Sequence, residues 1–156
     1  MTTTIAYRIS ALSPAVLDEA RAGRATERHC ASGGEPLRCC LRDAAAGEGL
    51  LLFNYEPPLP ASPYREKGAV FAHAAPCGGP ADDLPYPGDW YGRPQVLRAY
   101  DSAGRIHPAS RQHDGGDPVA ALTAVLAEPG VVLVHSRNVV YGCYMFSVLP
   151  TGAASR

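Results

Sequence analysis

The sequence predicts an α+β fold in which a largely antiparallel, curved sheet of six or seven strands packs with two helices on one side. Three observations lead to this prediction. Several short segments alternate apolar and polar side chains, as half-buried strands do. Two other segments begin with a capping residue followed by proline and carry apolar residues at helical spacing. The order of these elements lacks the strict alternation that indicates a parallel, doubly wound sheet.

The first half of the chain contains one predicted helix among short predicted strands. Residues 4–12 alternate loosely and indicate a strand. Ser13 is the expected N-cap of a helix that has Pro14 at its first position and ends near Gly23. Further strands are expected at 26–30, 36–42, 50–55 and 69–74. The alternation within 36–42 places Cys39 and Cys40 on opposite faces of its strand.

Two connections without regular structure interrupt this pattern. The segment 56–68, "EPPLPASPYREKG", is too rich in proline for a central strand. Residues 75–94 form a long irregular loop that carries Trp90 and Tyr91, and a loop of this length is typically a lid or a mobile excursion.

The second half continues with strands at 95–101, 131–136 and 143–149. Between the first two of them, Asp117 and Pro118 mark the start of a second helix. We expect a single globular domain over residues 1–150 and a frayed tail over 151–156.

Composition excludes several classes of function. The formal net charge is −1, which disfavours nucleic acid and anionic membranes as partners. No signal peptide or membrane span is evident, and the five cysteines do not form a disulfide framework, so a cytoplasmic location is expected. Of the 14 basic residues, 13 are arginine, the side chain suited to binding carboxylate or phosphate. A homodimer is left open.

The sequence contains none of the common cofactor motifs. We find no GxGxxG, P-loop, HExxH, GxSxG or paired CxxC motif, so we expect no cofactor. His73 and Cys77 are four residues apart and His29 adjoins Cys30, but neither pair has the spacing of a zinc site. We therefore expect no metal centre.

Three blocks resemble a bacterial family of uncharacterised proteins, the domain of unknown function numbered 1203. They are "GEGLLLFNYEPPLPASPYREKGAVF", "LRAYDSAGRI" and "HSRNVVYGCY", and the resemblance extends from the first strand to Val148. It carries over a set of polar and glycine positions: Arg38, Tyr55, Ser62 to Arg65, Gly68, Arg98 to Tyr100, His135, Asn138 and Gly142 to Tyr144.

This chain departs from the family pattern at three positions. Leu37 stands where the family has cysteine, Arg137 where it has a second histidine, and Ala69 where it has proline. Cysteine chemistry at the first of these positions is therefore not available here. The resemblance supplies motif positions and implies little chemistry.

The polar residues of these blocks predict a pocket for an anionic small molecule. Arg38, Arg65 and Arg98 are the candidate donors to that anion, because a buried arginine needs a partner. His135 is the candidate for proton transfer, and Tyr64 or Tyr100 for stabilising developing charge. Two further residues complete the predicted binding wall: Asn138 and Cys143.

The same residues also fit a purely structural interpretation. Nearby carboxylates can pair with each arginine, and a histidine beside an apolar strand is more often a hydrogen-bonded core residue. Three functions remain open. The first is a small cofactor-independent enzyme of bacterial metabolism, of the tailoring lyase, isomerase or cyclase type. The second is a non-catalytic ligand-binding or self-protection protein, and the third a protein-interaction module that docks through an exposed Trp90–Tyr91 loop.

Overall fold

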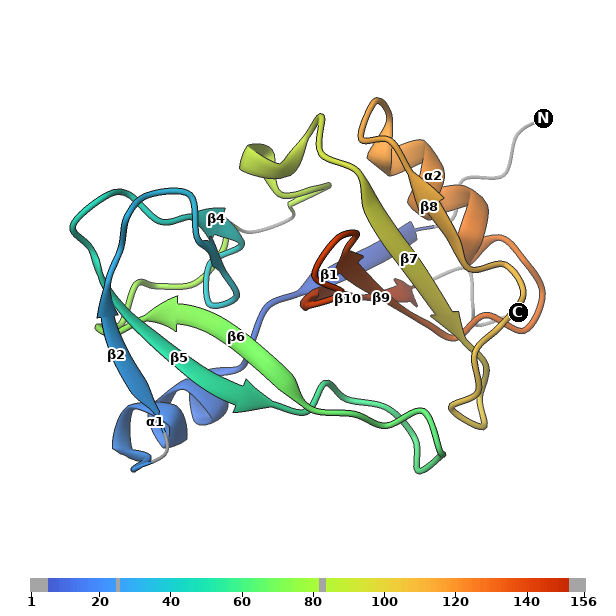
Figure 1. The fold of residues 1–156 in the computed structure, drawn as a ribbon. Coiled ribbons are helices and arrows are strands. Elements are labelled where there is room, and N and C mark those ends of the chain that lie inside the picture. Colours follow the sequence, from blue (N-terminus) through green and yellow to red (C-terminus); the bar gives the residue numbers. More distant parts are fainter. Residues whose placement is uncertain (1–5, 25, 82–83, 152–156) are drawn as a thin grey trace.

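The structure, a computed structural model, describes residues 6–24, 26–81 and 84–151. It confirms the α+β class and the two helices, and it contains two five-stranded sheets (Figure 1). The prediction of one curved sheet of six or seven strands is therefore wrong. Alternating side chains indicate that a segment is a strand, but they do not indicate which strands share a sheet.

One sheet is built from a continuous stretch of chain. Its spatial order is β2 (Glu27–Cys30), β5 (Gly49–Tyr55), β6 (Gly68–His73), β3 (Pro36–Leu37) and β4 (Arg42–Asp43). These strands pair antiparallel except β3 and β6, which pair in parallel at Leu37 and Phe71. Helix α1 (Pro14–Ala22) contacts β5 and buries Leu17 and Ala20. We call this the β5 sheet.

The other sheet joins the two ends of the described chain. Its spatial order is β1 (Ala6–Ser10), β10 (Tyr144–Thr151), β9 (Leu133–Asn138), β7 (Gln95–Tyr100) and β8 (Arg111–His113), all antiparallel. Helix α2 (Pro118–Leu126) lies against β7 and β8. We call this the β9 sheet. The helices thus pack on different sheets, so the expectation that both cover one side of a single sheet is wrong.

Both helix starts are formed by the capping residues that the sequence indicates. The Ser13 side chain accepts a hydrogen bond from the Val16 amide at 3.3 Å, and the Asp117 side chain accepts one from the Ala120 amide at 3.0 Å. A proline follows each cap, where the missing N–H would have no helical partner.

Residues 38–41 form a turn, in place of the continuous strand that the sequence predicts over 36–42. The chain reverses between β3 and β4, where the Leu41 amide donates to the Leu37 carbonyl at 2.9 Å and Leu41 has φ 59°. Cys39 and Cys40 are consequently both buried instead of pointing to opposite faces. The alternation was misleading because a leucine takes the left-handed conformation here, where glycine or asparagine would have signalled a turn.

The ends of the described chain pair with each other. The strand expected at 4–12 is β1, and residues 4–5 lie outside the described residues. Thr151, which the sequence assigned to a frayed tail, pairs with Ala6. Residues 152–156 lie outside the described residues.

Each sheet has its own hydrophobic core. Leu50, Leu51 and Val70 centre the core of the β5 sheet. The core of the β9 sheet includes Trp90, which lies in a short 3₁₀ turn, η1 (Gly88–Trp90). No helix among the described ranges is long and apolar enough to cross a membrane.

Candidate functional site

The connection between β5 and β6 reaches from one sheet to the other (Figure 1). His135 on β9 donates from Nε2 to the Pro58 carbonyl at 3.0 Å. Ser62 donates to the Gly104 carbonyl at 2.8 Å, beyond β7. Glu66 lies against two arginines of the β9 sheet. The proline-rich connection therefore covers polar side chains of β7 and β9.

His135 is a core residue of this covered region. Its ring packs edge to face between Tyr100 and Tyr144, with centroid distances of 4.9 and 5.3 Å. Burial lowers the pKa of His135 to about 4, and its Nδ1 has no hydrogen-bond partner within the described structure. The imidazole is therefore neutral near pH 7, with the proton on the nitrogen that faces Pro58.

This burial predicts a loss of stability in mild acid. Between about pH 6.5 and about pH 4 the unfolded chain protonates His135 while the folded chain does not, so stability falls as the pH is lowered. From about pH 7.5 to about pH 5 we expect this histidine to contribute a loss of about 2 kcal/mol. Urea unfolding of wild type and His135→Gln at both pH values measures this loss. The free energy of unfolding of the variant should fall by about 2 kcal/mol less than that of wild type. Equal pH dependence in both proteins would contradict the assignment.

The three predicted arginines do not meet in one pocket. Arg65 is half-exposed and pairs with Glu56, whereas Arg98 pairs with Glu66 at 3.2 Å. Arg38 is buried, and its Nε donates to the Tyr144 carbonyl at 2.7 Å. Burial lowers the pKa of Arg38 to about 10. The structural interpretation, in which carboxylates pair with the arginines, thus holds for Arg65 and Arg98, although Glu66 is not a partner that the sequence indicated for Arg98.

The remaining predicted residues are also separated. Tyr64 is exposed at 40%, while Tyr100 is fully buried against His135. The Asn138 backbone closes the hairpin between β9 and β10, because its amide donates to the Cys143 carbonyl at 2.8 Å. Of these residues, only Cys143 lines either of the two cavities described below.

A small pocket lies beside Cys143. It has a volume of about 200 Å³ and a mixed polar and apolar lining, contributed by the β5–β6 connection and the β9–β10 hairpin: Pro57, Glu66, Lys67, Gly68, Arg137, Tyr141, Gly142, Cys143 and Tyr144. We call it the Arg137 pocket. Arg137 was not a predicted site residue, although its position two residues after His135 places both on one face of β9.

Positive charge exceeds negative charge around the Arg137 pocket. Glu66 forms ion pairs with two arginines: with the buried Arg137 at 2.6 Å and with Arg98 at 3.2 Å. Lys67 and Arg137 are the two cationic side chains of the pocket lining. Arg137 also donates to the Gly142 carbonyl at 3.0 Å, while its Nε has no hydrogen-bond partner within the described structure. The pocket lining thus holds one carboxylate and two cations, and a third cation, Arg98, pairs with the same carboxylate.

The Trp90–Tyr91 loop does not present its tryptophan to a partner. Trp90 is fully buried, stacks on Phe146, and donates from its indole nitrogen to Asp43 at 3.0 Å. Tyr91 is half-exposed and packs on Tyr86. The expectation of an exposed Trp90 anchor is wrong, since a lone tryptophan in a proline-rich loop fits a core contact equally well.

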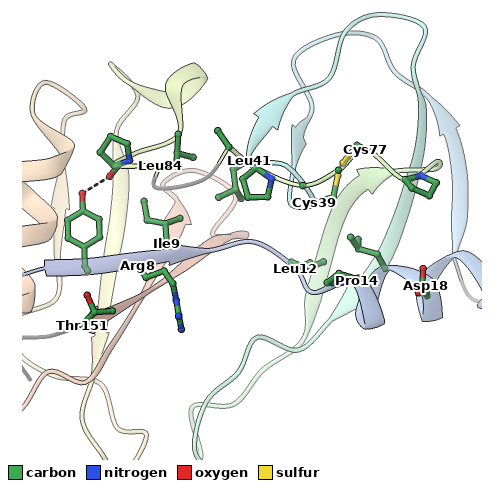
Figure 2. A pocket seen from close by; sticks show the side chains of 18 of the residues that line it. Arg8, Ile9, Leu12, Pro14, Asp18, Cys39, Leu41, Cys77, Leu84 and Thr151 are labelled. Atoms are coloured by element: carbon green, nitrogen blue, oxygen red, sulfur yellow. Dashed lines mark hydrogen bonds between the residues drawn. The ribbon is translucent and has the colours of Figure 1, made fainter. Parts of the chain in front are cut away.

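A much larger groove runs between β1 on one side and residues 76–81 and 84–85 on the other. Its volume is about 1310 Å³, and Figure 2 shows β1 and these stretches on its two sides. Tyr7 donates across it to the Pro85 carbonyl at 2.5 Å, and burial raises the Tyr7 pKa to about 12. Figure 2 shows Arg8 pointing away from Leu84, and Asp18 pairs with Arg21 at 3.3 Å. The described residues that line the groove therefore form no cluster of inward-directed cations.

One group of side chains within the described ranges could hold a metal ion. It consists of Cys39, Cys40, His73 and Cys77, whose ligand atoms all lie within 4.8 Å of one another. We call it the cysteine cluster. The sequence offered two signals, the adjacent cysteines and the His73–Cys77 spacing, but the strand predicted at 36–42 separated the first pair. The turn that replaces this strand brings both thiols to His73.

Comparison with known proteins supports the resemblance found in the sequence. No curated protein and no solved structure matches the chain. A family model matches residues 34–149, a stretch that contains the Arg137 pocket and the cysteine cluster but not β1 or α1. The resemblance had been extended to the first strand, where the match does not reach. Because the match covers more than half of the sequence, the chain belongs to the family of proteins of unknown function DUF1203.

Proposed function

We propose that this protein binds a compact anion, such as a phosphate or a short carboxylate, in the Arg137 pocket. The observation that carries the proposal is the charge balance: the pocket lining holds two cations, Lys67 and Arg137, and one carboxylate, that of Glu66, which also pairs with Arg98 outside the lining. Bringing guanidinium groups close together out of water is costly unless anions offset their charge. A ligand carboxylate or phosphate would supply the second negative group.

The surroundings of the pocket strengthen this charge argument. Arg38 is buried beside the same hairpin and donates only to carbonyl oxygens, those of Tyr144 and Pro36, among the described contacts. Its guanidinium therefore adds to the positive potential near Tyr144. A volume of about 200 Å³ suits a compact ligand. Tyr141 lines the pocket and is 82% exposed, so a bound ligand would find an aromatic ring free to cover it.

Arg137→Gln should weaken anion binding by about 10- to 100-fold, the effect of losing a hydrogen bond to a charged group. The probes are inorganic phosphate, sulfate and succinate, measured by calorimetry at constant ionic strength. Arg65→Gln is the matched control, because Arg65 pairs with Glu56 and does not line the pocket. The control should bind within about two-fold of wild type.

Two results would contradict the proposal. The first is that no probe binds wild type more tightly than chloride does. The second is that Arg137→Gln and Arg65→Gln bind the probes equally well, because binding would then lie elsewhere on the surface. Circular dichroism of each variant separates a loss of binding from a loss of fold.

A cofactor-independent enzyme acting on the same anion is the second candidate. Cys143 favours it, because this partly buried thiol lines the pocket with Arg137, and positive surroundings favour a reactive thiolate. His135 offers less support, since Nε2 is bonded to Pro58 and the ring lines neither cavity. Catalysis by His135, Tyr64 or Tyr100 stays a prediction. Mass spectrometry of a bound ligand after long incubation distinguishes the candidates, since a binding protein returns it unchanged.

A further inference from the structure

The cysteine cluster joins three separate segments of the β5 sheet and its surroundings. Cys39 and Cys40 lie in the turn between β3 and β4, His73 is the last residue of β6, and Cys77 follows in the loop. We propose that Cys39, Cys40, His73 and Cys77 bind one zinc ion through three sulfur atoms and one imidazole nitrogen. This site is independent of the proposed anion pocket.

The distances among Cys39, Cys40 and His73 are close to those of a tetrahedral zinc site. Zinc bonds of about 2.3 Å to sulfur and about 2.0 Å to nitrogen place tetrahedral ligands about 3.8 Å apart for two sulfurs and about 3.5 Å for sulfur and nitrogen. The Sγ atoms of Cys39 and Cys40 are 4.0 Å apart. His73 Nδ1 lies 3.5 Å from Cys39 Sγ and 3.9 Å from Cys40 Sγ. The Cys77 ligand atom lies within 4.8 Å of these three, so an ion fits among the four atoms after side-chain adjustments that bring Cys77 closer.

Two outer contacts prepare these ligands for a metal. His73 Nε2 lies 2.9 Å from Glu48 Oε2, so the imidazole can donate there and leave the Nδ1 lone pair directed at the cysteines. A carboxylate behind a ligating histidine is the usual arrangement in zinc sites. The His73 amide donates to Cys39 Sγ at 3.2 Å, a hydrogen bond that stabilises negative charge on sulfur.

The kinds of ligand atom in the cluster favour zinc as the metal and a structural role for the site. Three thiolates with one imidazole form a set that is common in structural zinc sites, in which the protein supplies all four ligands. The cluster is mostly buried, and Cys39 and Cys77 form part of the groove wall. Figure 2 shows their sulfur atoms close together beside the groove. The zinc would fasten the loop at Cys77 to the β5 sheet and so fix the position of this part of the groove wall.

Metal titration of the purified, reduced full chain tests the proposal. After removal of metal by a chelator, zinc affinity is measured by competition with a coloured chelator, and cobalt is titrated as a spectroscopic substitute. Wild type should bind one zinc per chain, and its cobalt form should show strong visible bands of tetrahedral cobalt with sulfur-to-cobalt charge transfer. Weak octahedral bands alone in wild type would overturn the proposal without any variant.

Variants then locate the metal. Cys77→Ala removes the ligand that lies in a loop, and zinc affinity should fall at least about 100-fold. Cys30→Ala is the matched control, because Cys30 is exposed on β2 and outside the cluster, and its affinity should equal that of wild type. Glu48→Gln should keep one zinc per chain with an affinity lowered about 10- to 100-fold. Equal zinc affinity in Cys77→Ala and Cys30→Ala would overturn the site.

Discussion

Replacing Trp90 with alanine should lower the free energy of unfolding by about 3–5 kcal/mol, the cost of emptying a large aromatic site in a core. The indole is fully buried, stacks on Phe146 with ring centroids 6.0 Å apart, and donates to Asp43 at 3.0 Å. Its loss removes apolar contacts and leaves a partly buried carboxylate with one donor fewer. Urea unfolding followed by far-ultraviolet circular dichroism measures the change.

Two further variants separate the parts of this effect. Trp90→Phe keeps an aromatic ring but loses the N–H donor. It should lower the free energy of unfolding clearly less than Trp90→Ala does. Tyr141→Ala is the control, because that side chain is 82% exposed, and its effect should stay within about 0.5 kcal/mol. If Trp90→Ala were as mild as the control, the tryptophan would not be a core residue in solution.

Arg38→Met should lower the free energy of unfolding by about 3 kcal/mol. Arg38 belongs to the turn that follows β3, yet its Nε donates to the Tyr144 carbonyl on β10, so one side chain bonds the two sheets together. Methionine fills much of the same volume but leaves that buried carbonyl without its donor, a cost of about 1–3 kcal/mol for each group. Chemical unfolding monitored by tryptophan fluorescence provides the measurement.

Arg65→Met is the comparison for Arg38→Met. Arg65 is half-exposed and pairs with Glu56. Its replacement should lower the free energy of unfolding by less than about 1 kcal/mol. Similar losses in both variants would show that the Arg38 bond to β10 contributes little. A loss confined to Arg38→Met would establish the contact between the sheets as a major source of stability.

The helices were predictable because their signals are local. Ser13 and Asp117 cap within three residues along the chain, and the prolines that follow them fit helix starts whatever the rest of the fold does. β5 and β6 were predictable for the same reason, because the pattern that indicates a strand lies within each segment. The division into two sheets depends on pairings such as Ala6 with Thr151, between residues from opposite ends of the chain. Residue alternation carries no information on such pairings.

The candidate site was harder to predict for a related reason. Arg98 and His135 face each other across β7 and β9, but the carboxylate that pairs with Arg98 comes from a connection in the other sheet. Nothing in the local sequence marks Glu66 as that partner. The cysteine cluster depended on Leu41 adopting a left-handed conformation, which leucine rarely does. Local patterns therefore indicated the polar residues without indicating their neighbours.

The order of strands in the two sheets has a consequence for folding during synthesis. Every strand of the β5 sheet lies between Glu27 and His73, so this sheet can form while the ribosome is still translating the second half. The β9 sheet cannot be completed then, because among the described strands β1 pairs only with β10, the last of them along the chain. β1 therefore stays unpaired until β10 has been translated. We expect the β5 sheet to form first and the pairing of β1 with β10 to form last.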